Sequence, residues 1–391
     1  MRLFGTLIKR LLQIILIPVV AVIIWMYIND ATLATRIISL ALTGSGGPEQ
    51  SVAGSALPAI PVADKSQTIS REAIQAALTY GETTGSHALL VYQNGALQLE
   101  HYFPGYDANS VTSTASMHKS VLGLLIGIAI DQGHIESVDE PASRYLSEWA
   151  NDERAAITIK QLLRQTSGID FPTFSFNPTG GFFQFMLGED ITGITLSQQQ
   201  WAAPGTRFDY NNVGPQALGI ILQRATGQNY ANYLSKNLWK KIGADDATVQ
   251  IDAEATGMAR TFCCINATAR SWLRVGLLHI QEGRFNGTQV VPQEWISEMT
   301  QPGTFEPNYG YLTWLGTEYK PEQRYNRKGS AVVPHSEPYA AEDVVYFDGF
   351  GGQRMYAIPS LNMVIVRTGD ISMDWDDAYL PNTLIRGLQT R

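Results

Sequence analysis

Residues 116–130 read SMHKSVLGLLIGIAI, in which a short polar start leads into a run that is apolar around every face of a helix. The run is too short to span a membrane, and a helix without a polar face has to be enclosed by protein. We therefore predict a central, buried core helix at residues 120–130, and the rest of the fold is expected to pack around it.

Ser116 and Lys119 form an S-x-x-K pattern where this helix begins. Residues three apart share a helix face, so the serine hydroxyl and the lysine amine can meet. A serine becomes a nucleophile when a base lies beside it, and burial lowers the pKa of a lysine so that it can take the proton. The pattern predicts Ser116 as nucleophile and Lys119 as its base.

A second pattern, Tyr210-Asn211-Asn212, lies in a predicted loop that follows Pro204 and Gly205. A phenol can protonate a leaving group, and a side-chain amide can hold a lysine. Tyr210 is therefore a candidate acid and Asn212 a candidate binding residue. A half-buried packing role is the alternative for the tyrosine.

A glycine-rich stretch, Gly349-Phe350-Gly351-Gly352, follows a strand-like run. Glycines let a bound carbonyl approach backbone N–H groups closely. The N–H groups of Ser116 and Phe350 would then form an oxyanion hole, bordered by Gly349 and Gly351. An ordinary hairpin turn is the alternative reading of these glycines.

Strand-like patterns occur near both ends of the chain, and helical patterns lie between them. This order predicts an α/β (α+β) fold, with an antiparallel sheet flanked by helices and an inserted helical subdomain. The predicted strands cover residues 87–92, 96–103, 343–347, 354–359 and 363–368. Further helices are predicted at 158–164, 215–225, 230–240 and 267–282, and from residue 378.

The N-terminal segment Leu11–Ile28 reads LLQIILIPVVAVIIWMYI, and basic residues precede it. About 18 to 20 apolar residues suffice to cross a bilayer, and preceding positive charges keep the N-terminus cytoplasmic. We predict a membrane anchor at residues 1–30 and an extracytoplasmic domain, periplasmic in a Gram-negative bacterium. A cleaved signal peptide is the alternative.

Residues 31–67 are expected to form a linker, since much of this stretch is rich in Gly, Ser, Pro and Ala. The hydrolase domain is then expected at 68–391. Its sheet layer would come from about 68–132 and 285–391, and its helical subdomain from about 133–284.

The formal net charge of -8, without a cluster of Lys and Arg, argues against a nucleic-acid partner. The six histidines are scattered, so no metal site is expected. Cys263 and Cys264 are adjacent, and neighbouring cysteines rarely reach disulfide geometry without strain. A buried pair of small apolar side chains is expected there, with a vicinal disulfide as the alternative.

The S-x-x-K pattern at Ser116, the Tyr210-Asn211-Asn212 pattern and the glycine-rich stretch after Gly349 occur in this order along the chain. Together they resemble the serine beta-lactamase and penicillin-binding-protein superfamily. Leu162–Gly168 (LLRQTSG) and Ala202–Thr206 (AAPGT) also look like stretches of that family. The resemblance runs from roughly residue 87 to residue 368. It implies the family's two-part fold and a reaction through an acyl-enzyme, with Ser116 attacking, Lys119 and Tyr210 moving protons, and no cofactor.

One departure from the family bears on the substrate. Many relatives carry Lys-Thr-Gly on the strand of the third motif, where this chain has Phe347-Asp348-Gly349. The missing cation weakens the case for penicillin-like or peptidoglycan substrates, unless Arg354 takes its place. The stretch Gly349–Gln353 looks more like the branch of 6-aminohexanoate-dimer hydrolases and carboxylesterases. We therefore expect a serine hydrolase that cleaves a small amide or ester.

Other functions stay open. They are a beta-lactamase or D-amino-peptidase activity, and a non-catalytic, membrane-anchored, penicillin-binding-like sensor. An α/β-hydrolase is disfavoured because the chain has no G-x-S-x-G pattern. His118 lies on a different helix face from Ser116, so we expect it at the surface or just behind the site.

Overall fold

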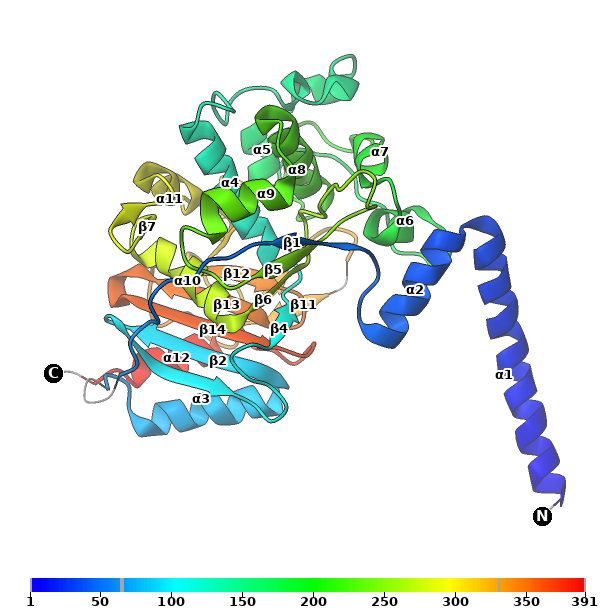
Figure 1. The fold of residues 1–391 in the computed structure, drawn as a ribbon, viewed down its shortest axis with the longest axis horizontal. Coiled ribbons are helices and arrows are strands. Elements are labelled where there is room, and N and C mark those ends of the chain that lie inside the picture. Colours follow the sequence, from blue (N-terminus) through cyan, green and yellow to red (C-terminus); the bar gives the residue numbers. More distant parts are fainter. Residues whose placement is uncertain (1, 64–66, 330, 390–391) are drawn as a thin grey trace.

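A six-stranded antiparallel sheet forms the centre of the fold, in the strand order β3-β2-β14-β13-β12-β9 (Figure 1). The computed structural model describes residues 2–63, 67–329 and 331–389, with side chains from Leu16 onward. Because β2 pairs with β14, the sheet joins the two ends of the chain, which confirms the predicted α+β fold. The strands are β2 (Ser86–Gln93), β3 (Ala96–Tyr102), β9 (Trp314–Leu315), β12 (Val345–Gly349), β13 (Gln353–Ile358) and β14 (Met363–Gly369).

Helices cover both faces of this sheet. Helices α3 (Arg71–Thr83) and α12 (Tyr379–Arg386) pack together on one face, and α10 (Ala269–Ile280) packs on the other (Figure 1). Successive side chains of a strand point to opposite faces, so in β14 Val364 and Val366 enter one core and Met363 and Ile365 the other. Burial on both faces explains why these strands read as apolar runs.

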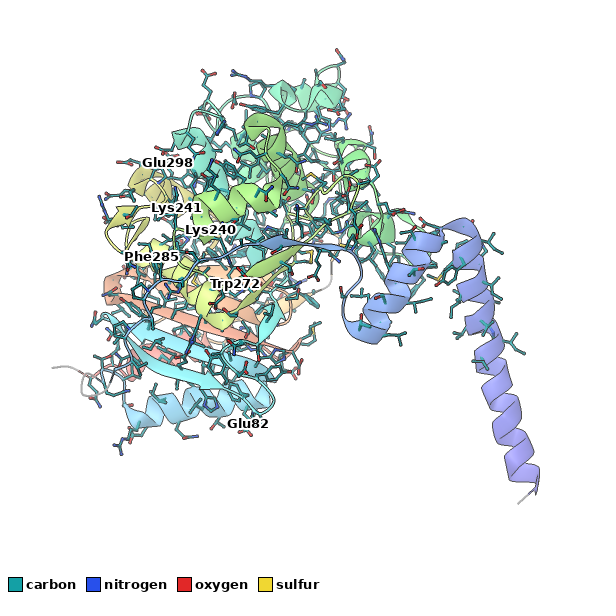
Figure 2. The ribbon with its side chains drawn as sticks, viewed as in Figure 1. Glu82, Lys240, Lys241, Trp272, Phe285 and Glu298 are labelled. Atoms are coloured by element: carbon teal, nitrogen blue, oxygen red, sulfur yellow. A yellow bond between two sulfur atoms is a disulfide. The ribbon has the colours of Figure 1, made fainter. Side chains whose placement is uncertain are left out.

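The predicted central helix is α4 (Met117–Asp131), which contacts the helical region on one side and strands β12 and β13 on the other. Its side chains from Met117 to Ala129 are buried. Figure 2 shows Trp272 of α10 inside the body, whereas Glu82 and Glu298 lie on its outside. The other helices are α5 (Ile159–Leu163), α6 (Gly181–Leu187), α7 (Ile191–Leu196), α8 (Val213–Thr226), α9 (Tyr230–Leu234) and α11 (Gln293–Met299).

A second, four-stranded sheet has the order β1-β5-β6-β4, and no pattern in the sequence indicates it. Its strands are β1 (Glu49–Val52), β4 (Val111–Ser113), β5 (Ala247–Gln250) and β6 (Ile265–Thr268). Strands of three or four residues are too short to show a period. The pairing of β4 with β6 matters for the site, because it brings the chain after residue 260 beside the chain that leads to Ser116.

Two short hairpins and several single turns complete the fold. The hairpins pair β7 (Arg284–Phe285) with β8 (Thr288–Gln289), and β10 (Glu322–Arg324) with β11 (Val332–Pro334). Turns of 3-10 or π-helix lie at Ala142–Arg144, Ser147–Trp149, Glu153–Ala156, Ser235–Trp239 and Pro359–Leu361. Helix α10, which the sequence pattern groups with the helical subdomain, packs on the central sheet. The division into domains stays a prediction.

The stretch predicted as a linker contains regular structure. Helix α2 (Ala31–Thr43) lies against α6, and the Arg36 guanidinium donates to the carbonyl oxygens of Leu187 (2.6 Å) and Gly188 (3.1 Å). Strand β1 pairs along its length with β5. Residues 31–43 and 49–52 of the predicted linker are therefore fixed to the body, which corrects the expectation of a linker in this part of the chain.

The prediction of a membrane anchor is wrong. Helix α1 (Arg2–Asn29) extends away from the body (Figure 1). Within the described ranges, no helix is both long enough and apolar enough to cross a bilayer. Side chains 11–15 of the proposed span lie outside those that the structure describes. The predicted extracytoplasmic location rested on this anchor and is therefore wrong as well.

Candidate active site

Ser116 is the residue immediately before α4, and a turn at Ala115, whose φ is +48°, sets it there. Lys119 lies on the first turn of the same helix. Its Nζ donates to the Ser116 Oγ at 2.7 Å. The predicted pair is therefore in direct contact, with the serine half-buried and the lysine side chain enclosed.

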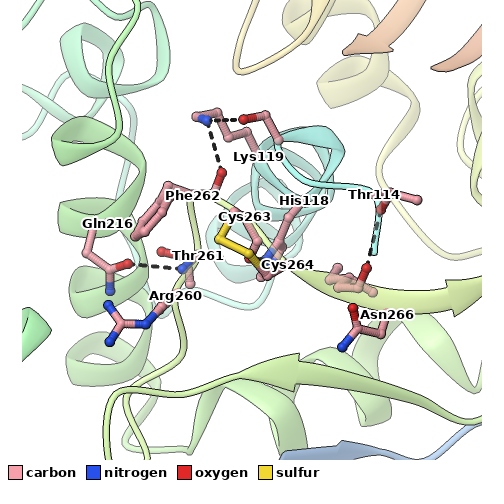
Figure 3. Close-up of a disulfide and its surroundings, with 12 residues drawn as sticks. Thr114, His118, Lys119, Gln216, Arg260, Thr261, Phe262, Cys263, Cys264 and Asn266 are labelled. Atoms are coloured by element: carbon pink, nitrogen blue, oxygen red, sulfur yellow. Dashed lines mark hydrogen bonds between the residues drawn. A yellow bond between two sulfur atoms is a disulfide. The ribbon is translucent and has the colours of Figure 1, made fainter. Parts of the chain in front are cut away.

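The environment of Lys119 changes its acidity. Burial lowers the pKa of Lys119 from 10.5 to about 7, although the negative charge of Asp348 opposes this shift. The Nζ also donates to the Phe262 carbonyl oxygen at 2.9 Å (Figure 3). Near neutral pH a large fraction of the amine is then uncharged, and the uncharged amine can accept a proton.

Tyr210 completes a cluster of three side chains. The Lys119 Nζ lies 4.7 Å from the centre of the Tyr210 ring. Burial raises the pKa of the Tyr210 phenol far above its ordinary value, while a hydrogen bond with Ser116 opposes that rise. The phenol is therefore protonated at neutral pH. Tyr309, Trp314 and Tyr325 pack around its ring.

Asn212 lies at the last position before α8 and is half-buried. It does not hold Lys119 in this structure, because the lysine amine donates to Ser116 and Phe262. The neighbouring Asn211 has a structural part, since its Oδ1 accepts from the Val213 N–H at 2.9 Å. A contact between Asn212 and the substrate stays a prediction.

The glycine-rich stretch forms the turn between β12 and β13, directly beside the serine. At Gly349 an added Cβ would lie 2.2 Å from the Thr114 carbonyl oxygen, so strand β12 touches the backbone that leads to Ser116. Gly351 has a φ of +76°, a conformation that favours glycine. Phe350, between them, is about half exposed at 49%. The Phe350 N–H as an oxyanion donor stays a prediction.

This close approach predicts the effect of Gly349→Ala. The new methyl group would collide with the Thr114 carbonyl, so β12 must move away from the serine turn. We expect kcat/KM to fall by about 100-fold, as small displacements of reacting groups can do. Gly181→Ala is the matched control, because its Cβ would meet Pro172 only at 3.5 Å. Both variants are assayed on one p-nitrophenyl ester. Full activity of the Gly349 variant would show that the close approach of β12 to Thr114 is not needed for activity.

Arg354 does not replace the missing lysine of the third motif. Its side chain is fully buried and pairs with Asp348 at 2.6 Å and Asp377 at 2.7 Å. It also donates to the Gly349 carbonyl oxygen at 2.8 Å. The guanidinium therefore braces the β12–β13 turn from inside the protein and cannot face a substrate.

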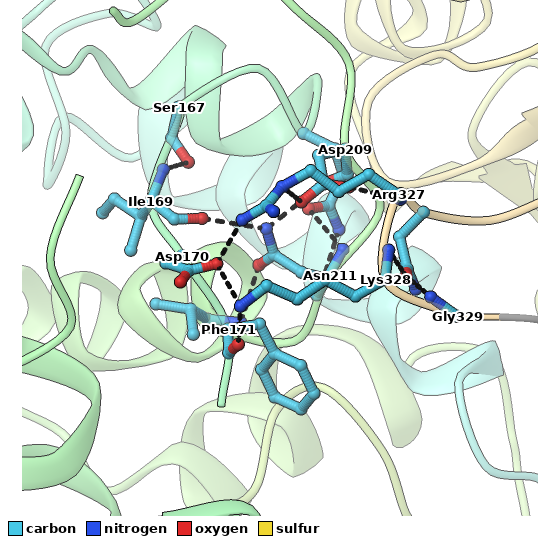
Figure 4. Close-up of polar contacts among 12 residues, drawn as sticks. Ser167, Ile169, Asp170, Phe171, Asp209, Asn211, Arg327, Lys328 and Gly329 are labelled. Carbon is cyan, nitrogen blue, oxygen red and sulfur yellow. Dashed lines mark hydrogen bonds and ion pairs between the residues drawn. The ribbon is translucent and has the colours of Figure 1, made fainter. Parts of the chain in front are cut away.

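The segment that follows β10 contacts Tyr210 and Asp348, and no sequence pattern indicates these contacts. Its Tyr325 carbonyl accepts from the Tyr210 N–H at 3.2 Å, and the Tyr325 hydroxyl donates to Asp348 at 2.6 Å. Beyond Tyr325, Arg327 and Lys328 both contact Asp170 (Figure 4). These two cations are paired with Asp170, so residues 327 and 328 are fixed to the segment that follows Ile169.

Cys263 and Cys264 form a disulfide, so the expectation of an unbonded pair is wrong. The bond depends on the local backbone, and Cys264 has a φ of +75°, which the sequence does not reveal. His118, expected at the surface or behind the site, is fully buried behind it.

The sequence does not predict Phe262 as a site residue, because its contribution to the site is a backbone oxygen. Asp348 belongs to the third motif, but the sequence pattern does not predict a role for it.

Known hydrolases resemble this chain in sequence and in fold. The chain is 28% identical over 298 residues to the 6-aminohexanoate-dimer hydrolase of Paenarthrobacter ureafaciens, covering 73% of each protein. A Bacillus anthracis structure assigned as a 6-aminohexanoate-dimer hydrolase matches with a TM-score of 0.70 at 21% identity, covering 90% of this chain and 92% of that one. A family VIII carboxylesterase matches at 0.60 and 15% identity, covering 87% and 100% respectively.

The two solved structures share the fold, and a family model supplies the classification. The model described as Beta-lactamase matches residues 74–369, which include the serine, the lysine, the tyrosine and the glycine-rich turn. This match covers most of the chain. The protein therefore belongs to the beta-lactamase family.

Proposed function

We propose that this serine hydrolase cleaves a small linear amide or ester through an acyl-enzyme on Ser116. The observation that carries the proposal is the 2.7 Å contact between the Lys119 Nζ and the Ser116 Oγ, made by an amine whose pKa burial lowers to about 7. An enclosed amine of this kind is a general base at neutral pH, and a serine beside such a base is an activated nucleophile.

Each proton has a defined route in the proposed reaction. The Ser116 hydroxyl gives its proton to Lys119 while its oxygen attacks the substrate carbonyl. The oxyanion that forms is stabilised by the N–H groups of Ser116 and Phe350. The Tyr210 phenol then protonates the departing amine or alcohol and regains a proton from the Lys119 ammonium. Water, deprotonated by the same lysine, releases the acid and restores Ser116.

The charges around the site favour an uncharged linear substrate group over a penicillin-like carboxylate. On strand β12 the family's lysine is replaced by Phe347, which is fully buried. The guanidinium of Arg354, on the neighbouring strand β13, is enclosed between two carboxylates. The name of the Paenarthrobacter ureafaciens relative, 6-aminohexanoate-dimer hydrolase, supports an amide as the bond that is cleaved.

Aromatic side chains on the segment before and within α6 support an apolar substrate portion. Phe182 contacts Phe171 and Phe174 edge to face. Phe185 continues the row to Phe262, the residue whose carbonyl oxygen accepts from Lys119. The rings of Phe171, Phe174 and Phe182 are at least partly exposed and suit a flexible methylene chain.

A substrate panel combined with intact-mass measurement tests the proposal. The panel contains p-nitrophenyl esters, a linear 6-aminohexanoate dimer, D-amino peptides and a chromogenic cephalosporin. We expect turnover of the ester and the linear amide, and a transient mass increase equal to the acyl group. Peptide mapping should place that group on Ser116 and not on Ser113, an exposed serine three residues earlier.

The other outcomes discriminate between the alternatives. Preferred turnover of the cephalosporin or of a D-amino peptide would replace the proposed substrate class with one of those two. A mass increase that persists for hours without turnover would identify a binding or sensor protein. Modification at any residue other than Ser116 would contradict the proposed nucleophile.

A further inference from the structure

The disulfide between Cys263 and Cys264 lies in the turn that contacts Lys119 and His118 (Figure 3). The residue that precedes it, Phe262, provides the carbonyl oxygen that accepts from the Lys119 Nζ at 2.9 Å. The only other hydrogen bond of this amine within the described ranges is the one to Ser116. The position of the Phe262 carbonyl thus helps to fix the direction in which the amine points.

Three consecutive residues of this turn each contact one residue of the nucleophile segment. Phe262 accepts from Lys119. Cys263 accepts from the His118 Nδ1–H at 2.6 Å. The Cys264 N–H donates to the carbonyl oxygen of Ala115 at 3.2 Å. The turn at 262–264 is therefore a backbone template for residues 115–119.

The contact through His118 does not vary near neutral pH. Its Nδ1 must carry a proton because the Cys263 carbonyl can only accept, and its Nε2 then accepts from the Tyr230 hydroxyl at 2.6 Å. Burial lowers the pKa of His118 to about 4. The histidine is therefore neutral under ordinary conditions and is a fixed strut between the turn and Tyr230.

The chain is also fixed on both sides of the cysteines. Before them, the Thr261 N–H donates to the Gln216 Oε1 at 3.0 Å, and the Thr261 hydroxyl donates to the Pro215 carbonyl at 2.9 Å. After them, Ile265 begins β6. The two cysteines therefore occupy the short connection between two anchored segments, and Cys264 has a left-handed backbone conformation there, with a φ of +75°. Such a conformation is unfavourable for a residue with a Cβ unless a further constraint holds it.

We propose that the Cys263–Cys264 disulfide is a positioning element for Lys119, which keeps the 262–264 turn in the conformation that presents the Phe262 carbonyl to the amine. Opening the bond frees Cys264 to leave its left-handed conformation and so displaces the template under the catalytic pair. The inference rests on the proposed function of Lys119 as base. It makes hydrolysis sensitive to reductants although neither sulfur touches a substrate.

Chemical reduction of the full chain tests this inference. Tris(2-carboxyethyl)phosphine transfers two electrons to the S–S bond, water supplies two protons and the oxygen of the phosphine oxide, and two thiols result. We expect kcat to fall by about 10- to 100-fold with little change in KM. The acid limb of the pH–rate profile should move above pH 7, because water then reaches the amine. Reoxidation with oxidised glutathione should restore the rate.

The double variant Cys263→Ser, Cys264→Ser is the control without a disulfide. Its kcat should equal that of the reduced protein and should not change when phosphine is added. Melting temperatures of all forms separate a positioning effect from unfolding. Two free thiols in the protein as purified would overturn the inference. So would an unchanged kcat and pH profile after thiol titration shows full reduction, or a fall in kcat matched by loss of folded protein.

A second readout does not depend on the substrate. A fluorophosphonate labels an activated serine, and we expect reduction to slow the labelling of Ser116 by a similar factor. Slower labelling without turnover of any substrate would support the inference while the proposed hydrolysis fails. Turnover and labelling that are both indifferent to reduction would overturn the inference and leave the proposed hydrolysis intact.

Discussion

Lys119→Ala should lower kcat/KM by about 10^4- to 10^6-fold, and adding Ser116→Ala should lower it little further. Residues that act as one unit show such non-additivity, because removal of either member stops the same step. The physical reason is that no other base contacts the Ser116 hydroxyl in the described structure, where Lys119 lies at 2.7 Å. Steady-state assays of the two single variants and the double variant on a p-nitrophenyl ester measure the effect.

The role of Lys119 as base also predicts the direction in which kcat/KM changes with pH. Only the uncharged amine can accept a proton, so kcat/KM should rise with pH and level off above about 7, the pKa to which burial lowers Lys119. Lys119→Arg is the matched control, because it keeps a cation that cannot be deprotonated. We expect it to be as inactive as the alanine variant at every pH. Activity retained by the arginine variant would show that Lys119 is not the base.

Arg354→Ala should reduce the free energy of unfolding by about 3 to 5 kcal/mol, because it leaves two buried carboxylates without their cation. Asp348 and Asp377 both pair with this guanidinium inside the protein. Burial already raises the pKa of Asp348, and Arg354 and Lys119 are among the groups that oppose the rise. Denaturant unfolding of the variant and of the parent protein measures the loss.

The pH dependence of the Arg354 variant follows from the same charges. Without the guanidinium the folded-state pKa of Asp348 lies further above its unfolded value, so the folded state binds protons more readily. The loss of stability should therefore be greatest above this raised pKa and should shrink as the pH falls through it. Adding Asp348→Asn and Asp377→Asn should recover part of the loss at neutral pH.

An exposed ion pair provides the control for this effect. Arg386→Ala breaks the pair with Glu337 at the surface and should leave stability nearly unchanged, because solvent screens such a pair. Equal losses in the Arg354 and Arg386 variants would show that burial of the charges is not the cause. A loss at Arg354 that the two asparagine substitutions do not relieve would point to packing instead.

The parts of the fold that the sequence predicts are those with long, strongly apolar patterns. Helix α4 is apolar on all sides, and strands β13 and β14 are buried on both faces, so each shows a clear signal. Each predicted boundary of these elements lies within about three residues of the observed one. The S-x-x-K spacing also predicts the meeting of Ser116 with Lys119, because it follows from helix geometry alone.

The parts that escaped prediction depend on contacts between distant segments. Strand β1 is recognisable only beside β5, which lies far along the chain. The Phe262 carbonyl, the loop of Tyr325 and the pairing of Arg354 likewise have no local signature. The membrane prediction failed for the opposite reason, since it relied on a local run of apolar residues alone.

The position of β14 between β2 and β13 has a consequence for synthesis of the protein. The hairpin of β2 and β3 leaves the ribosome well before β14, the strand that joins this hairpin to β13. Until then the β2 edge has no partner, and a nascent chain cannot assemble the sheet on which its site depends. We expect a nascent chain to become active only after β14 has emerged, and a truncation that removes β14 to separate β2 from β13 in the sheet.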